Sequence, residues 1–206
     1  MSDAQWYLTI RRYGGTGAPE EIAQRIRDGL LPRIRQEATF RAYYVARLDG
    51  GGGIFSASVF EDRAASVRVS EAAVQFAERD LAGLLTGAPL ITRSAVSVHL
   101  DATRPGTDAY MMVRVTEGLG PSTGTLPTVQ EKLVPLTLEQ PGFRHLYTGR
   151  DEEQPDRSVA LAVFSNRSTA TAAHAQVAAL MAQHRDIWPQ SPKVLLAGEV
   201  IVAALA

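Results

Sequence analysis

The chain of 206 residues contains no cysteine. Disulfide bonds, thiolate nucleophiles and cysteine ligands for zinc are therefore excluded. The chain also lacks an excess of positive charge, since 21 basic and 22 acidic residues leave a formal net charge of −1. Nucleic-acid backbones and anionic bilayers are held by clustered lysine and arginine. We therefore expect neither nucleic acid nor membrane as a partner.

Long hydrophobic runs are missing as well. No stretch reaches the roughly 18 apolar residues of a membrane span, and the opening MSDAQWYL lacks the basic segment and apolar run of a leader. We expect a cytoplasmic protein. The four histidines do not have the spacing of metal ligands, and GGTGAPEE at residues 14–21 fits neither common nucleotide fingerprint. Neither a metal nor a cofactor is predicted.

What the chain does contain is an internal repeat. TFRAYYVAR at residues 39–47 returns as GFRHLYTGR at residues 142–150. When residues 7–47 are placed on 110–150 without a gap, ten of 41 pairs are identical, against about two or three expected by chance. A duplication explains this best. It predicts two domains, residues 1–102 and 103–206, joined by the turn-forming DATRPGTD.

Each copy has the pattern strand, helix, strand, strand, helix, strand. In the first copy WYLTIRRY is an extended stretch, and Pro19 followed by two glutamates suits a helix start. That helix carries one apolar stripe: Ile22, Ile26, Leu30 and Ile34. Pro32 interrupts the stripe, and Pro135 occupies the same place in the second copy. Because an interior proline removes a hydrogen bond, both first helices should kink there.

The later elements repeat in the same way. RAYYVARL and IFSASVF are rich in β-branched and aromatic residues and are joined by Asp49 and four glycines, which predicts a hairpin. Asp62 and Asn166 stand in equivalent places, where a side-chain oxygen can cap the next helix. RSAVSVHL and GEVIVAAL close the two copies as final strands.

This order of elements predicts an α+β protein made of two tandem ferredoxin-like βαββαβ units. Each unit places its helices on one face of an antiparallel sheet and leaves the other face uncovered. Two units in one chain can bury those faces together. We therefore expect the units to pack sheet to sheet as a pseudo-dimeric α+β barrel.

FRAYYVARLDGGGGIFSASVFEDRAAS at residues 40–66, with a looser copy over 143–170, resembles the antibiotic biosynthesis monooxygenase-like group of dimeric α+β barrel proteins. The resemblance covers nearly the whole chain and implies a ligand cleft between each sheet and its helices. The group includes cofactor-independent oxygenases of electron-rich aromatic substrates, haem-degrading enzymes and stress-response proteins. The haem-degrading branch has an asparagine on the first strand, and this chain has none in either copy, so haem degradation is not expected.

Two tyrosine–arginine pairs are the first catalytic candidates. Tyr7 and Arg11 share one strand face because their separation is even, and Tyr110 with Arg114 repeats the pair. An arginine there can hold a phenolate or carboxylate and stabilise developing negative charge. The alternative is a surface arginine stacked on a tyrosine.

Tyr44 and Tyr147 are substrate-binding candidates, because their hydroxyls could reach a cleft; their duplication fits a packing role equally well. Arg47 and Arg150 are expected to pair with loop acids such as Asp49 or Asp151.

The second copy has further candidates near its last helix. His184 follows a stripe that includes Val177, Met181 and Trp188, which would aim it into the second cleft as a general base. Near a helix end it could equally touch solvent and be favoured by the helix dipole. Trp188 is a substrate-binding candidate or a hydrophobic plug.

Two hypotheses of function follow. The first is a barrel that binds a small apolar or aromatic molecule and acts as a cofactor-independent monooxygenase on an aromatic or phenolic substrate. The alternative is a noncatalytic module of the same fold, related to stress or to interaction with partners. Further pairing into a homodimer of tandem barrels is compatible with both. An open pocket with converging polar groups would favour the first hypothesis, and filled clefts would favour the second.

Overall fold

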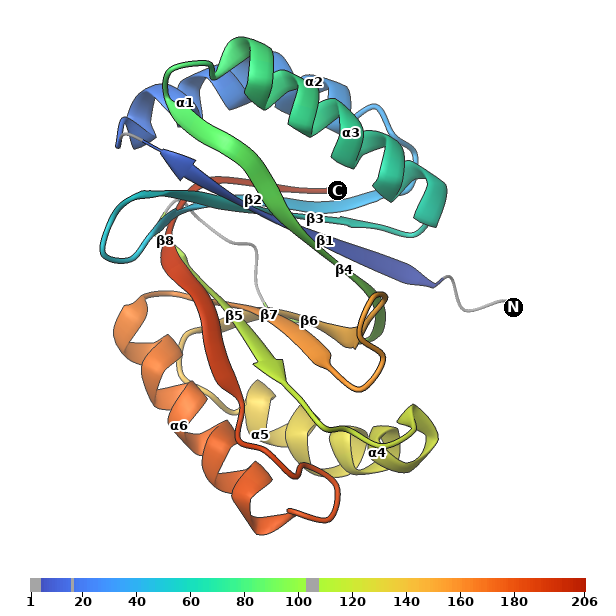
Figure 1. Cartoon of the computed structure of the whole chain (residues 1–206). Coiled ribbons are helices and arrows are strands. Elements are labelled where there is room, and N and C mark those ends of the chain that lie inside the picture. Colours follow the sequence, from blue (N-terminus) through green and yellow to red (C-terminus); the bar gives the residue numbers. More distant parts are fainter. Residues whose placement is uncertain (1–4, 16, 103–107) are drawn as a thin grey trace. The chain divides into compact units, whose positions relative to one another are not determined.

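The structure is a computed structural model that describes residues 5–15, 17–102 and 108–206 (Figure 1). The chain divides into two compact units, Met1–Arg93 with Glu199–Ala206, and Ser94–Gly198. The predicted linker between the repeats lies largely outside the described residues, so the boundary at residue 102 stays a prediction. Each unit is described by itself below.

The first unit follows the predicted order of elements. Its elements are β1 (Trp6–Gly15), α1 (Pro19–Arg25), the π-helical turn η1 (Ile26–Leu30), α2 (Leu31–Ile34), β2 (Phe40–Leu48), β3 (Gly53–Phe60), α3 (Arg63–Asp80) and the first part of β4 (Leu85–Asp101). Strand β3 pairs antiparallel with both β1 and β2. The strands lie in the order β4-β1-β3-β2, followed by the end of β8 (Lys193–Leu205).

The second unit repeats this arrangement. Its elements are β5 (Tyr110–Thr116), α4 (Ser122–Thr128), the π-helical turn η2 (Val129–Leu133), α5 (Val134–Leu138), β6 (Phe143–Asp151), β7 (Ser158–Phe164), α6 (Arg167–Gln183) and the first part of β8. The strands lie in the order β8-β5-β7-β6, followed by the end of β4. In each unit the helices cover one face of the sheet (Figure 1). The predicted α+β class with two ferredoxin-like units is confirmed.

Each first helix contains a π-helical turn directly before the proline at which a kink was predicted. In the first unit the Leu31 N–H donates to the Ile26 carbonyl, five residues back, directly before Pro32. In the second unit the Val134 N–H donates to the Val129 carbonyl, directly before Pro135. Proline has no N–H to complete the normal ladder, and the wider turn absorbs the irregularity.

The predicted helix caps are also present in both units. The Asp62 side chain accepts hydrogen bonds from the backbone N–H groups of Ala64 and Ala65 at the start of α3. The Asn166 side chain accepts one from the N–H of Thr169 at the start of α6. Each cap satisfies N–H groups that have no partner inside the helix.

Apolar side chains are packed unequally under the helices of the two units. The first unit has one continuous helix-side core that includes Tyr13, Tyr43 and Phe76. The second unit has two smaller clusters, one around Phe143 and Phe164 and another around Trp188. The space between those clusters is where the second unit is hollow.

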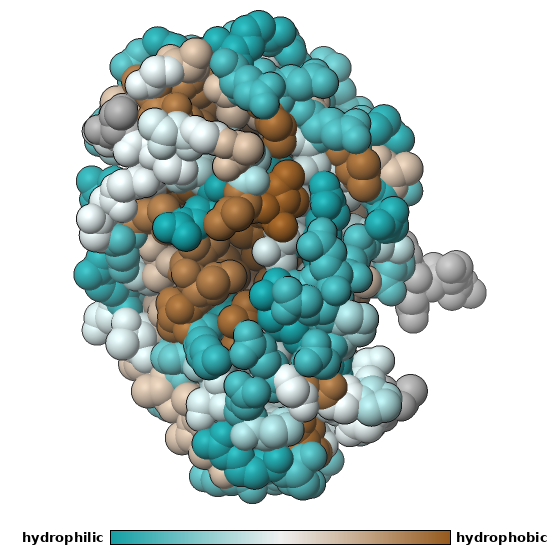
Figure 2. Space-filling model, in the orientation of Figure 1, coloured by the Kyte–Doolittle hydropathy of each residue, from teal (hydrophilic) through white to brown (hydrophobic). Residues whose placement is uncertain are grey.

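The surface of the helices is largely hydrophilic (Figure 2). The large apolar side chains that remain exposed among the described residues are Leu90, Leu138, Val194 and Leu195. No helix in the described part of the chain is long and apolar enough to cross a membrane.

Candidate functional site

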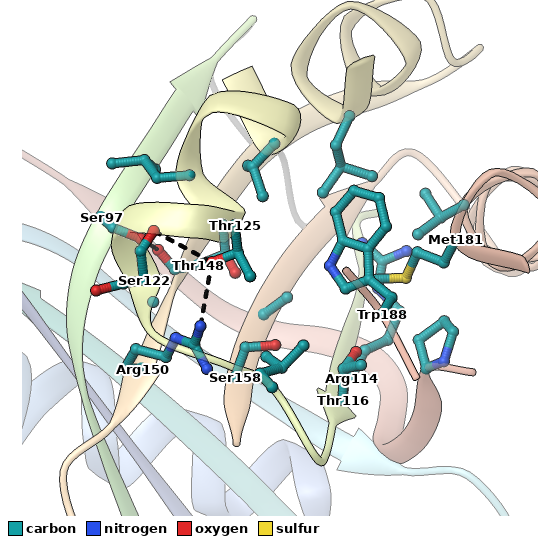
Figure 3. Close-up of a pocket in the computed structure, with 18 of the residues that line it drawn as sticks. Ser97, Arg114, Thr116, Ser122, Thr125, Thr148, Arg150, Ser158, Met181 and Trp188 are labelled. Carbon is teal, nitrogen blue, oxygen red and sulfur yellow. Dashed lines mark hydrogen bonds between the residues drawn. The ribbon is translucent and has the colours of Figure 1, made fainter. Parts of the chain in front are cut away.

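A cleft lies between the sheet and the helices of the second unit (Figure 3). The volume of the cleft, measured as the space open to the centre of a water-sized sphere, is about 70 Å³. A single water needs roughly 10–15 Å³ by that measure, so the cleft has room for a small molecule. Its apolar walls are formed mainly by Leu119, Leu126, Val129, Leu133, Leu146, Val177, Met181 and Trp188. Its polar groups are Ser97, Arg114, Thr116, Ser122, Thr125, Thr148, Arg150 and Ser158.

Arg114 on β5 is the cationic group buried in this cleft. Its side chain is only 5% exposed, and burial lowers its pKa to about 10. Among residues 5–15, 17–102 and 108–206, none forms a hydrogen bond or an ion pair with its guanidinium group. A buried charge without a partner is costly. The cleft therefore suits a ligand with an anionic group or a strong hydrogen-bond acceptor.

Arg11 holds the equivalent position in the first unit and has partners. It is fully buried, its Nε donates to Ser70 Oγ at 3.1 Å, and a terminal NH₂ group donates to Ser58 Oγ at 3.1 Å. In the second unit these two serines are replaced by His174 and Ala162, which leaves Arg114 without either hydroxyl. The alternative of a surface arginine stacked on a tyrosine is wrong for both copies, because both arginines are buried.

The first unit's own helix-side cleft is filled. Tyr13, Tyr43 and Phe76 line a void of about 10 Å³, enough for about one water. Burial raises the pKa of both tyrosine hydroxyls. At the aligned positions the second unit has Thr116, Leu146 and Leu180. The smaller side chains of the second copy open a cleft that the larger side chains of the first copy close.

His174 stands near Arg114 on α6. Its side chain is half-buried, and burial, followed by the charge of Arg114, lowers its pKa. Its Nδ1 atom is buried and has no hydrogen-bond partner among the described residues. Both effects favour the neutral form of the imidazole.

Arg150 on β6 lies at the other side of the cleft and is hydrogen-bonded to the segment at the start of α4 (Figure 3). A terminal NH₂ group donates to the Gly120 carbonyl at 2.7 Å and to Thr125 Oγ1 at 3.1 Å. The Thr125 hydroxyl donates in turn to the Ser122 carbonyl at 3.3 Å. Partial burial lowers the pKa of Arg150.

The strand-end arginines, Arg47 and Arg150, have other partners than the loop acids predicted from the sequence. Asp151 pairs with Arg157, while Arg150 turns to the backbone at the start of α4. Arg47 pairs with Glu199 at 2.6 Å. The prediction paired these arginines with loop acids that are close in sequence. The contacts depend instead on the shape of the loops, which neighbouring residues alone do not determine.

Trp188 and His184 were both predicted to face the cleft, and only the tryptophan lines it. Trp188 is 2% exposed and packs with Leu119, Val177 and Met181. Helix α6 ends at Gln183, so His184 is its C-terminal capping residue and leaves the predicted stripe. The His184 ring meets the Trp188 ring edge to face, with 6.2 Å between the ring centroids.

The predicted tyrosines do not line this cleft. Tyr147 lies between Leu146 and Thr148, which do line it, so strand alternation turns Tyr147 to the opposite face of the sheet. Its hydroxyl donates to Asp101 at 3.5 Å. Tyr44 follows Tyr43, which faces the helices of the first unit, and so it also points to the opposite face of its own sheet.

Tyr7 and Tyr110 share a strand face with the arginines but lie farther along it. Tyr110 is buried beneath the guanidinium of Arg167, 5.7 Å from its ring centre. Tyr7 is half-buried. Of the residues proposed from the sequence, the structure brings Arg114 and Trp188 together in the cleft.

The α4 residues and Arg150 line the cleft but were not predicted from the sequence as cleft residues. The available signal was the difference between the copies at aligned positions. At three aligned positions the side chain of the second copy is smaller than that of the first: Thr116 for Tyr13, Leu146 for Tyr43 and Ser158 for Ile54. Within the described ranges no group of three or more histidine or acidic side chains is placed to hold a metal ion.

No family model matches this chain, and no curated protein matches it. Solved structures do match over nearly its full length. A candidate monooxygenase from Lactobacillus acidophilus NCFM has 12% identity and a TM-score of 0.73, over 98% of this chain and 96% of its own. A second, from Fusobacterium nucleatum subsp. nucleatum, has 12% identity and a TM-score of 0.76, over 98% and 95%.

An anthrone oxidase-like protein is similar to the whole of this chain and to 94% of its own, with 15% identity and a TM-score of 0.59. At such identities the likeness concerns the fold. The chain has the α+β fold of these proteins, the fold that its resemblance to the antibiotic biosynthesis monooxygenase-like group implied.

Proposed function

We propose that the cleft of the second unit binds a small aromatic molecule with one acidic group, and that the protein oxidises a phenolic substrate of this kind with O₂, as a cofactor-independent monooxygenase. The observation that carries the proposal is Arg114, a nearly fully buried cation that has no partner among the described residues and lines an otherwise largely apolar space.

The arrangement suits the chemistry of a phenolate. A phenol gives up electrons to O₂ far more readily once it is deprotonated, and a fixed cation favours the deprotonated form. Arg114 supplies that charge with several N–H donors in a planar group. Trp188 and the aliphatic walls offer an apolar surface for the ring and keep water from the reacting atoms.

The comparisons support the oxygenase part at the level of fold. Two of the similar structures are named as candidate monooxygenases and a third as anthrone oxidase-like. One fold hosts many activities, so this support is an analogy, and the site must carry the chemistry.

A noncatalytic binding protein is the second candidate, and one observation favours it. The described residues that line the cleft include no aspartate, glutamate, histidine or tyrosine. A general base in direct contact with the space is therefore missing from the lining. The same cleft would then hold an aromatic anion without turning it over.

One set of measurements separates these candidates. Benzoate binding is measured by calorimetry, and O₂ uptake is followed with an electrode over a panel of phenols. In the Arg114→Met variant we expect benzoate binding to weaken roughly 10- to 100-fold, from the loss of a charged hydrogen bond, and uptake to disappear. The matched control is Arg11→Met, which removes the buried arginine of the filled cleft and should leave both measurements near wild type.

The outcomes discriminate. Benzoate binding with no uptake on any phenol would refute the monooxygenase and support the binding protein. Equal binding by the wild type and Arg114→Met, or none by either, would refute the site itself. Circular dichroism of both variants checks that they are folded.

A further inference from the structure

We propose that Thr116 and Ser158 form a second recognition point in the cleft of the second unit, and that they bind a neutral oxygen substituent of the aromatic ligand while Arg114 binds its acidic group. This inference deepens the proposed function and rests on it. It narrows the ligand class to aromatic molecules that carry a hydroxyl or carbonyl group at a second position of the ring.

The register of the sheet places the two hydroxyl side chains next to each other. Thr116 on β5 and Ser158 on β7 are directly opposite across the antiparallel pair, and both line the cleft. Opposite residues in such a pair have their Cβ atoms about 4.5–5.5 Å apart. One ligand oxygen that lies over the pair can therefore contact both hydroxyl groups.

The hydroxyl pair is adjacent to Arg114. Arg114 precedes Thr116 by two residues on β5, and both side chains line the cleft from the same face of the sheet. Figure 3 shows them on the same side of the cleft as Trp188. A strand rises about 3.4 Å per residue, so the Cα atoms of Arg114 and Thr116 are about 7 Å apart. A benzene ring with substituents at two positions spans a distance of this order.

Neither hydroxyl has another use in the protein. Thr116 is only 3% exposed, and Ser158 is half-buried. Within the described ranges, neither hydroxyl forms a hydrogen bond with another residue. A buried hydroxyl without a partner costs free energy, and a ligand oxygen would supply that partner.

The first unit shows that the fold does not require these hydroxyls. The aligned residues are Tyr13 and Ile54, which are opposite each other in the same register and belong to the apolar core. The hydroxyls of the first unit lie instead beside Arg11, where Ser58 and Ser70 accept its hydrogen bonds. The second unit therefore lacks the hydroxyls that satisfy the arginine and has two others that face the cleft.

The pair suits an uncharged group better than a second acid. A hydroxyl both donates and accepts, so Thr116 and Ser158 can bind either a hydroxyl or a carbonyl group. The cation nearest to Ser158 in the register is Arg150 on β6, which already donates to the Gly120 carbonyl and to Thr125. We therefore expect a neutral oxygen over the pair.

The test compares benzoate with its three monohydroxy derivatives by calorimetry at pH 7, without O₂ so that oxidation contributes no heat. At that pH each carboxyl group is ionised and each hydroxyl group is neutral, so the probes have one charge and differ in the second oxygen. For the wild type we expect the better of 3- and 4-hydroxybenzoate to bind about tenfold more tightly than benzoate, the upper range for one neutral hydrogen bond. The hydroxyl of 2-hydroxybenzoate bonds its own carboxylate, so this isomer should bind like benzoate.

The variants test the residues through a ratio of two affinities measured in the same protein, which a general loss of affinity does not change. The double substitution Thr116→Val and Ser158→Ala removes both hydroxyls and should abolish the preference for the hydroxybenzoate. Thr116→Ser keeps the hydroxyl and should keep the preference. The matched control is Ser56→Ala on β3 of the first unit, which introduces the residue that the second copy has at the aligned position, Ala160; it should keep both affinities.

The outcomes separate this inference from the proposed function. A wild type that binds benzoate through Arg114 but prefers neither 3- nor 4-hydroxybenzoate would refute the inference and leave the proposed function standing. A preference that survives in the double variant would do the same. Benzoate binding that does not depend on Arg114 would refute the proposed function, and the inference with it. Circular dichroism checks folding, and Ser158→Ala alone carries the test if Thr116→Val does not fold.

Discussion

Replacing Arg114 by methionine should make the protein more stable. Burial lowers the pKa of this arginine from 12.5 to about 10, and at 1.36 kcal/mol per pH unit the folded state disfavours the charged form by about 3 kcal/mol. Methionine removes this cost and keeps much of the apolar contact of the stem. Because some local polar solvation is also lost, we expect a gain of about 1–3 kcal/mol in the free energy of unfolding.

The sign of the effect with pH is fixed. A base whose folded-state pKa is lowered by burial destabilises the folded state at every pH below that value. The cost shrinks as pH rises from about 10 toward the ordinary value. The advantage of Arg114→Met should therefore be constant at neutral pH and decline only in strong alkali.

Urea unfolding at neutral pH, without ligand, is the assay, with Arg11→Met as the matched control. The control also removes a buried guanidinium, but it deprives Ser58 and Ser70 of their hydrogen bonds, so its gain should be smaller or negative. A loss of stability in Arg114→Met, or an equal gain in both variants, would refute the idea of an unpartnered charge. Benzoate should raise the melting temperature of the wild type and leave that of Arg114→Met unchanged.

Three further predictions concern the cleft and its surroundings. The double substitution Thr116→Tyr and Leu146→Tyr copies the filled first unit, so it should abolish benzoate binding at a stability cost of about 1–3 kcal/mol; retained binding would contradict this. Arg150→Ala should destabilise by about 1–2 kcal/mol and speed amide exchange in Ser122–Thr128, and unchanged exchange would oppose it. A hydrogen bond from His145 lowers the pKa of Asp101 below its usual 3.8, so the carboxylate stabilises above pH 3.8 and the contribution is lost as pH falls through the folded pKa. The urea midpoints of wild type and Asp101→Asn should therefore converge with acidification, and a gap that persists at low pH would count against this.

The fold was predictable because its signals are local. The gapless repeat, the period of the apolar residues and the caps at Asp62 and Asn166 each depend on a few neighbouring residues. An irregularity at Pro32 was expected for the same reason, in the form of a kink. The π-helical turn that precedes this proline was not predicted.

The site was only partly predictable. Arg114 was identified because strand alternation puts it on a face with other candidates, and Trp188 because of its place in an apolar stripe. Tyr44 and Tyr147 were expected at a cleft, but they lie on the opposite face of their sheets. His184 was expected on a helix that ends one residue earlier, at Gln183. Tertiary packing decides where a helix ends and which face of a sheet lies on the cleft. The spacing of residues along the sequence is only a weak guide to either.

The amino-acid sequence was enough to show that the chain is duplicated, that each copy is a ferredoxin-like unit, and that each copy has an arginine at the same point of its first strand. Which of the two arginines is free to bind a ligand became clear from the three-dimensional packing. The partners of Arg11 come from 47 and 59 positions away in the chain, and the second copy has lost both hydroxyls. Whether a buried charge is satisfied depends on such distant side chains meeting in space, and no local pattern reports that.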